Sequence, residues 1–286
     1  VVEGDAIAFA QHLQRICGGR VIAHRRFGTA KWLLTDSNHP VSLPALSEYI
    51  GQQVSKDGRN EELPEHLDFV SSRTEFYTAP TVLPTVERSS IKLDLLRRDF
   101  SINTLAISLS HERWGDLIDL FGGLNDLKQG IIQVLHSLSF VDDPTRILRA
   151  VRYEQRFGFQ IASRTLELLQ DAVDLLERVS PTRIRHELER ILQERRPETI
   201  IARLKQLGVL HAIYPTLPAD DKLSHRFERL RNALAATPAP HLAEESVELL
   251  YWGAWVQDLS AQEHDELINR LALEARTALL MGDLNH

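Results

Sequence analysis

After Ile91 almost the whole chain carries apolar residues at the three- and four-residue spacing of amphipathic helices, whereas the first hundred residues mix strand and helix patterns. A short strand pair near 114–119 and 131–134 is the one interruption that we predict. The spacing predicts helices over 94–106, 144–157, 163–177, 181–194, 197–206 and 223–235, with more beyond residue 241. The predicted fold is therefore of the α+β class, an α/β head followed by an all-α body.

The head begins with a helix and continues with short strands. The pattern predicts a helix over 6–16, two hairpin strands over 20–24 and 30–35, and a third strand over 66–71. Residues 36–65 are polar and contain three prolines, so we interpret them as an inserted excursion with one short helix around 45–53.

The composition limits the class of protein. The chain has 286 residues and no run of 18 apolar residues, which excludes a transmembrane helix. The single cysteine, Cys17, excludes a disulfide framework and is typical of a cytoplasmic protein. The net charge is −7, yet 15 of the arginines lie between Arg88 and Arg196. Arginine suits bidentate contacts with phosphates and base edges, although from composition alone genomic bias with ordinary surface ion pairs explains the arginines slightly better.

The helix that begins near Pro144 carries the most informative pattern. Proline at the first helical position places Asp143 at the N-cap, one turn from Arg146. A carboxylate and a planar guanidinium so placed can read the edge of a nucleobase. One face of this helix carries four arginines: Arg146, Arg149, Arg152 and Arg156. A polyanionic ligand would offset their mutual repulsion; taken alone, a capping Asp143 and arginines paired with neighbouring acids explain the pattern better.

Two further segments are candidates for chemistry. Arg97-Arg98-Asp99 can hold a triphosphate or a ribose, or form a solvated charged helix start. Asp68 lies in the middle of an apolar strand, where a buried carboxylate needs either a metal ion or an ion pair with Arg73. The sequence contains no Gly-rich phosphate loop, no histidine pair at metal-binding spacing within a helix, and no serine nucleophile elbow.

Several ordered motifs resemble one known family. The motifs are Phe27-Gly28-Thr29-Ala30, Ser72-Arg73-Thr74-Glu75-Phe76-Tyr77, Arg97-Arg98-Asp99-Phe100-Ser101-Ile102-Asn103, Asp119-Leu120-Phe121-Gly122-Gly123, and the stretch from Phe140 to Arg152 with Phe157-Gly158-Phe159. In this order and spacing, over roughly residues 1–195, they are similar to the bacterial tRNA nucleotidyltransferase and poly(A) polymerase family (class II CCA-adding type). The resemblance implies a polymerase-β-like head.

The resemblance also implies an activity, partners and site residues. The activity is addition of C, A or both to the 3′ acceptor end of tRNA from CTP and ATP without a nucleic-acid template. Asp143 and Arg146 would pair with the incoming base, and Arg149 and Arg152 would hold the triphosphate. The remaining implied roles are phosphate and sugar contacts for Arg97, Arg98, Asp99 and Asn103, and structural support of this site for Arg183 and Glu187.

The sequence departs from the family at its catalytic motif. The family holds two Mg²⁺ ions with an Asp-x-Asp pair, and these 286 residues contain no such pair. Only Asp68 matches a catalytic carboxylate, so we expect a chain truncated at its N-terminus and inactive alone. The expected domains are a head over 1–110, a base-recognising neck over 111–195 and a tRNA-binding body over 196–286. The alternatives are a poly(A) polymerase and a non-catalytic RNA- or nucleotide-binding fragment; the oligomeric state stays open.

Overall fold

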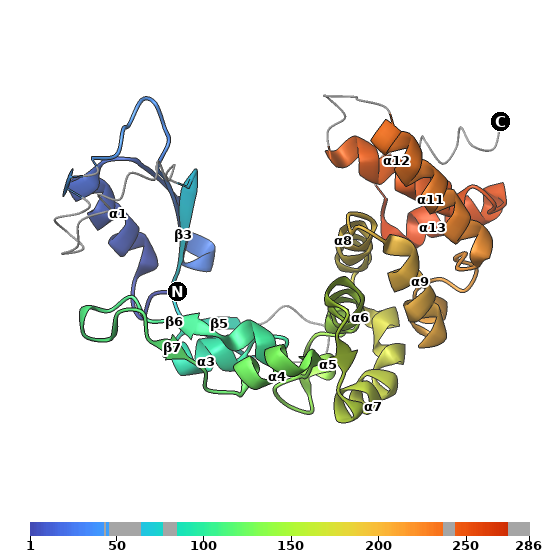
Figure 1. Ribbon diagram of the computed structural model, residues 1–286, viewed down its shortest axis with the longest axis horizontal. Coiled ribbons are helices and arrows are strands. Elements are labelled where there is room, and N and C mark those ends of the chain that lie inside the picture. Colours follow the sequence, from blue (N-terminus) through green and yellow to red (C-terminus); the bar gives the residue numbers. More distant parts are fainter. Residues whose placement is uncertain (43, 46–63, 77–84, 237–243, 274–286) are drawn as a thin grey trace. The chain divides into compact units, whose positions relative to one another are not determined.

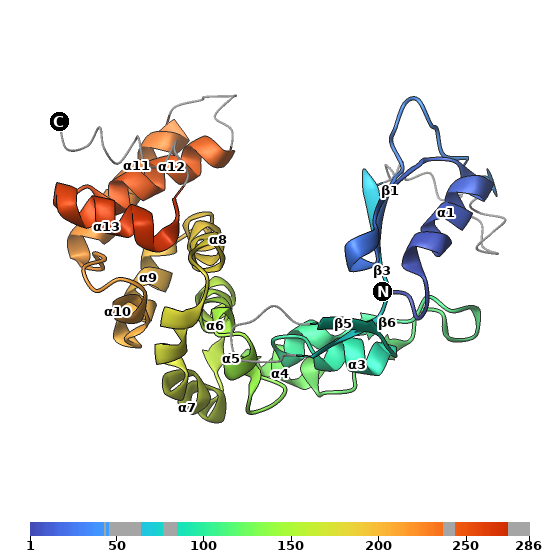
Figure 2. The same cartoon turned by 180° about the vertical axis from the view of Figure 1, so that it is seen from behind.

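The computed structural model describes residues 1–42, 44–45, 64–76, 85–236 and 244–273. Small sheets come first and helices follow, which confirms the predicted α+β class (Figures 1 and 2). The described chain forms two compact units, the first ending at Arg97 and the second beginning at Arg98.

The first unit is built on a three-stranded antiparallel sheet. Its strands, in the order β1-β2-β3, are β1 (Arg20–His24), β2 (Thr29–Leu33) and β3 (His66–Val70). Helix α1 (Ala6–Cys17) packs on this sheet, and Asp5 caps it by accepting from the N–H groups of Ile7 and Ala8. The helix and the three strands agree with the predictions. The helix expected around 45–53 lies, apart from Ala45, outside the described residues.

A hairpin and a short helix complete the first unit. The strands are β4 (Arg73–Phe76) and β5 (Thr85–Arg88), and the helix is α3 (Ile91–Leu96). The prediction of one helix over 94–106 is wrong. Phe100 is extended, bridges to Val134 and is fully buried, while the Asp99 carboxylate accepts from the Phe100 N–H at 2.9 Å. This side-chain bond competes with helical hydrogen bonding, and only a 3-10 helix, η2 (Ser101–Thr104), follows.

The strand pair predicted between 114–119 and 131–134 is also wrong. Each of these stretches does contain a short strand, but the partners differ. Strand β7 (Leu117–Ile118) pairs with β6 (Ala106–Ile107), and β8 (Ile131–Ile132) pairs in parallel with β9 (Gln160–Ile161). Helix α4 (Gly123–Gln129) separates β7 from β8. The sequence pattern extends a helix as far as residue 106, so it misses β6 as the partner of β7.

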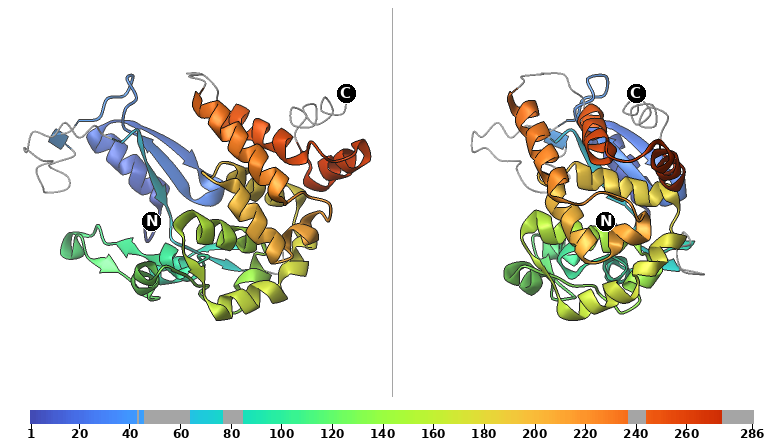
Figure 3. Two further views of the ribbon diagram at one scale, coloured as in Figure 1. Left: turned by 45° about the vertical axis from the view of Figure 1, so that its right-hand side comes forward. Right: turned by 90° about the vertical axis from the view of Figure 1, so that its right-hand side faces the viewer.

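The rest of the second unit is helical, and one hydrophobic core runs through it from Phe100 to Leu271. The predicted helices over 144–157, 181–194, 197–206 and 223–235 are confirmed within a few residues, and the one over 163–177 divides into α7 and a 3-10 helix. Figure 3 shows α11 and α12 packed side by side. The helices are α5 (Ser139–Asp142), α6 (Thr145–Phe157), α7 (Ser163–Asp171), η4 (Val173–Arg178), α8 (Pro181–Leu192), α9 (Pro197–Gln206), α10 (Val209–Ile213), α11 (Asp221–Ala236), α12 (Glu244–Val256) and α13 (Ala261–Leu271).

None of the described helices is both long and apolar enough to cross a membrane.

Close packing at Gly123 leads to a stability prediction. A Cβ atom placed there would overlap the backbone carbonyl oxygen of Ser101, so η2 would have to move away from α4. We expect Gly123→Ala to lower the free energy of unfolding by about 2–3 kcal/mol. Gly122→Ala is the matched control, because a Cβ there meets no atom and only its φ of +75° is unfavourable, worth about 1 kcal/mol. Urea unfolding measures both; equal losses would contradict the predicted overlap.

Candidate nucleotide-binding site

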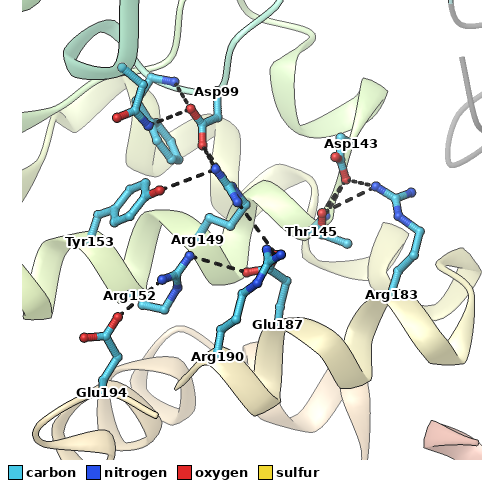
Figure 4. Close-up of polar contacts among 12 residues, drawn as sticks. Asp99, Asp143, Thr145, Arg149, Arg152, Tyr153, Arg183, Glu187, Arg190 and Glu194 are labelled. Carbon is cyan, nitrogen blue, oxygen red and sulfur yellow. Dashed lines mark hydrogen bonds and ion pairs between the residues drawn. The ribbon is translucent and has the colours of Figure 1, made fainter. Parts of the chain in front are cut away.

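The start of α6 holds the Asp143 carboxylate in one orientation. Its Oδ1 atom accepts from the Thr145 N–H at 3.0 Å, from the Thr145 hydroxyl at 2.6 Å and from Arg183 Nη2 at 2.6 Å (Figure 4). Asp143 itself is extended, with φ −142° and ψ 94°. The helix begins at Thr145 with Pro144 as its N-cap, one residue later than predicted, but the Asp143 carboxylate still accepts from the Thr145 N–H as a capping side chain does. Arg183, expected to support the site, makes its ion pair with Asp143.

Arg146 is the second residue of α6 and is almost completely buried, with 6% of its surface exposed. One of its Nη atoms donates to the Ser139 hydroxyl at 2.6 Å, which ties the guanidinium to α5. The protein thus fixes a carboxylate and a guanidinium at one end of the same helix.

Asp99 forms the centre of a second group of contacts. Its carboxylate accepts from Arg149 Nε at 2.9 Å and from Asn103 Nδ2 at 2.8 Å, in addition to the Phe100 N–H. Asp99 is only 8% exposed, so the alternative of a solvated helix start is wrong for this residue. Burial raises the pKa of Asp99, but the charge of Arg149 and the three hydrogen bonds outweigh it and lower the pKa below 3.8.

This lowered pKa predicts how stability depends on pH. A carboxylate with a lowered pKa in the folded state stabilises the fold above its unfolded-state pKa and loses that contribution as the pH falls through the lower, folded-state value. Above about pH 5, the free energy of unfolding of the native chain should therefore be roughly 2 kcal/mol higher than that of the Asp99→Asn variant. The difference should shrink below pH 3.8. Denaturant titrations over this range test it; a difference that grows at acidic pH would contradict the assignment.

The arginine-bearing face of α6 meets two glutamates from the α8 segment. Glu187 Oε1 lies 3.8 Å from Arg149 Nη1, and Glu187 Oε2 lies 3.8 Å from Arg152 Nη2. Glu187 also accepts from Arg190 at 2.7 Å. Glu194 then lies 3.3 Å from Arg152. Figure 4 shows the resulting alternation of acidic and basic side chains along α6.

This alternation explains why several arginines can share one face of α6. Acidic neighbours balance Arg149, Arg152 and Arg156, so the alternative of ion-paired arginines describes the free protein. Sequence reasoning missed Glu194 and Arg190. Glu187, Arg190 and Glu194 are three and four residues apart in the helix predicted over 181–194, and this spacing was the signal for them. In the structure α8 ends at Leu192, just before Glu194.

The remaining predicted site residues fall into two groups. Arg98 lies beside the Asp99 group and donates to the Asn103 backbone carbonyl at 3.1 Å. Arg97 belongs to the first unit, where its guanidinium pairs with the buried Asp94 at 2.8 Å. Asp68, also in that unit, is exposed rather than buried. It lies opposite Lys31 in the sheet, and its ion pair is with His66 at 3.6 Å instead of Arg73.

The apolar run around Asp68 suggested burial, but α1 covers the other face of the strand. Asp68 therefore needs no metal ion to be stable, since 61% of its side chain is exposed. Within the residues that the structure describes, no three His, Cys, Asp or Glu side chains gather closely enough to bind a metal ion.

Two family models match the chain. Residues 1–133 match the "Poly A polymerase head domain", and residues 158–220 match the "Probable RNA and SrmB- binding site of polymerase A". The chain is 44% identical over 218 residues to the A-adding tRNA nucleotidyltransferase of Geobacter sulfurreducens, covering 76% of this chain and 22% of that protein. It is 40% identical to the A-adding tRNA nucleotidyltransferase of Halalkalibacterium halodurans, covering 74% and 44%. The chain thus spans less than half the length of these relatives.

Solved structures of similar proteins share the fold. A CCA-adding enzyme in an apo form superposes with a TM-score of 0.78 at 36% identity, covering 100% of this chain and 60% of the other. The Thermotoga maritima CCA-adding enzyme complexed with tRNA gives a TM-score of 0.70, and a CCA-adding enzyme complexed with ATP gives 0.72. Both are 33% identical and cover 99% of this chain and 58% of the other.

These matches confirm the resemblance that the motifs indicated. The chain belongs to the class II CCA-adding and A-adding tRNA nucleotidyltransferase family.

Proposed function

We propose that this chain selects the incoming nucleotide and binds the RNA acceptor in a reaction that adds A to the 3′ end of tRNA. The main support for this proposal is the Asp143 carboxylate at the start of α6, which Thr145 and Arg183 hold in place one turn from the buried Arg146. The choice of A over C rests on the two A-adding relatives, since both bases present the edge that this pair recognises.

The two oxygens of Asp143 have different surroundings. Oδ1 takes the three donors from Thr145 and Arg183, whereas in the described part of the chain Oδ2 has no hydrogen-bond donor. The side chain is 20% exposed, so a ligand can reach it. A carboxylate oxygen held in this way accepts from an exocyclic amino group, which adenine carries at N6 and cytosine at N4.

Arg146 supplies the complementary donor. A guanidinium has five N–H donors and no acceptor, so it pairs with the ring nitrogen acceptor beside the amino group of adenine or cytosine. Guanine and uracil present the reverse pattern, a carbonyl beside a ring N–H. Each of their two groups would then face a group of the same kind, which is how we infer that the site rejects them.

The ion pairs behind this base-reading pair suit a triphosphate and a ribose. We assign Arg149 and Arg152 to the phosphates, and Arg97, Arg98, Asp99 and Asn103 to phosphate and sugar contacts. Arg183 and Glu187 support the others by holding Asp143 and the two phosphate arginines. Because Glu187 already balances Arg149 and Arg152, these guanidiniums stay in place before a nucleotide arrives.

In the addition itself, the 3′-hydroxyl of the RNA gives up its proton to solvent, and its oxygen forms a bond to the α-phosphorus of ATP. The bond from that phosphorus to the bridging oxygen breaks, and pyrophosphate leaves with the electron pair. We propose Asp68, exposed on β3, as one carboxylate contributing to catalysis. The sequence contains no Asp-x-Asp pair, so we expect no addition by these 286 residues alone.

The experiment measures two quantities on the purified chain. Equilibrium binding of ATP tests nucleotide selection, and incorporation of labelled ATP or CTP with Mg²⁺ tests the chemistry on tRNA ending in CC, on tRNA ending in C and on a generic RNA. We expect ATP binding without incorporation. Incorporation of A on the CC end would support the activity and contradict the expected inactivity. Incorporation of C, extension of the generic RNA, or no ATP binding would contradict the proposed function.

A further inference from the structure

A cavity of about 770 Å³ lies where α6 ends, between the start of α9 and the middle of α11. All of its lining residues belong to the second unit. The charged residues on its wall are Arg156, Glu194, Arg195, Arg196, Glu228 and Arg231. Four arginines against two glutamates give this wall a formal charge of +2, whereas the whole chain carries −7. The cavity is therefore a local site of positive charge.

The four arginines differ in how firmly acids hold them. Arg231 makes a two-pronged contact with Glu198, at 2.9 and 3.2 Å, and Arg156 lies 3.4 Å from Glu194. Arg195 and Arg196 are exposed, and within the described residues neither side chain has an ion-pair partner. These two guanidiniums thus remain available to a ligand and supply the uncompensated positive charge of this wall, because acids balance Arg156 and Arg231.

The wall indicates the class of ligand. Among the described residues that line the cavity, Ile200 is the one apolar side chain and none is aromatic. A nucleobase or an apolar peptide would need more apolar or aromatic surface than this. Planar guanidinium groups instead bind phosphate oxygens in pairs. A second hollow, of about 530 Å³, shares Asn232 with the first and is also lined by Arg226 and Arg229 of α11. Arg226 is paired with Asp258 at 2.8 Å, so Arg229 is the residue that extends the positive charge along α11.

We propose that this cavity binds backbone phosphates of the RNA acceptor, with Arg195 and Arg196 as the principal contacts. The proposal rests on the proposed function, because it needs an RNA whose 3′ end lies at the base-reading pair. Arg146 and Arg156 are ten residues apart on α6, about 15 Å along the helix. That length corresponds to roughly four phosphates of one strand, so one RNA can occupy both places.

The test compares RNA binding by the native chain and by the double variant Arg195→Gln/Arg196→Gln. We expect the variant to bind tRNA lacking its terminal A at least tenfold more weakly. The slope of log K against log salt should fall by about 1.5–2, because two phosphate contacts are lost. Arg178→Gln is the matched control: Arg178 is exposed in the same unit and lies in the segment matched by the RNA-binding family model, but it does not line the cavity.

The outcomes separate this proposal from the proposed function. ATP binding, measured in parallel, should be the same in both variants and in the native chain. Any of three results would overturn the phosphate site. The double variant could lose no more RNA affinity than Arg178→Gln, its salt slope could stay unchanged, or the native chain could fail to bind RNA. If the native chain bound no ATP but the double variant still lost RNA affinity as predicted, the proposed nucleotide selection would be contradicted and the phosphate site would stand. Circular dichroism and urea unfolding check that the variants are folded.

Discussion

Replacing Asp143 with Asn should weaken ATP binding by about 10- to 100-fold and raise the affinity for GTP relative to ATP. An adenine contact made by both Asp143 and Arg146 is worth about 1–3 kcal/mol. Asparagine presents an amide N–H₂ where the carboxylate oxygen Oδ2 lay, so a donor then faces the amino group of adenine. The same N–H₂ group pairs with the carbonyl of guanine. Isothermal titration of the variant with each nucleotide gives both numbers.

This substitution separates base reading from helix capping. Asn is as good an N-cap as Asp, and its amide oxygen can still accept from the Thr145 N–H. Asp143→Ala is the comparison, because it removes the cap as well and should cost about 1 kcal/mol of stability. If the Asp143→Asn variant were folded and kept the native ratio of ATP to GTP affinity, Asp143 would be a capping residue alone.

Replacing Glu187 with Ala should lower the free energy of unfolding of the helical unit by about 3 kcal/mol. Glu187 is 6% exposed and lies against Arg149, Arg152 and Arg190. Removing Glu187 leaves the buried Arg152 with Glu194 and Arg149 with Asp99, so each loses part of its balancing charge. Such a loss at a buried guanidinium costs more than the loss of an exposed ion pair. Thermal and urea unfolding measure the loss. ATP affinity should fall as well, because the two phosphate arginines lose their fixed positions.

Two further variants test this explanation. Glu177→Ala removes an exposed glutamate from the same unit and should change stability by less than about 0.5 kcal/mol. Combining Glu187→Ala with Arg152→Met removes one of the stranded charges and should recover part of the loss, a coupling of about 1 kcal/mol or more. Strictly additive losses would show that Glu187 acts through packing and not through charge.

The elements near the base-reading pair could be predicted because their signals are local. Proline at position 144 together with Asp143 fixes where α6 begins, and the apolar spacing fixes its buried face. The motif resemblance then pointed to the family, which the comparisons confirmed. Nothing in these steps depends on contacts between distant parts of the chain.

What the sequence did not predict depends on such distant contacts. The partner of β7 is β6, and Phe100 is drawn out of a helix by its bridge to Val134 and by the buried core. Ser139, the partner of Arg146, carries no pattern that distinguishes it from other serines. Asp68 was expected to be buried because strand alternation does not tell which face a helix covers.

The start of α6 should read the amino edge of the incoming base. Equilibrium binding of ATP, CTP, GTP and UTP to the native chain, at one salt concentration, tests it most directly. We expect ATP and CTP to bind at least tenfold more tightly than GTP and UTP, because only adenine and cytosine match Asp143 and Arg146. Equal affinities for all four nucleotides would contradict it.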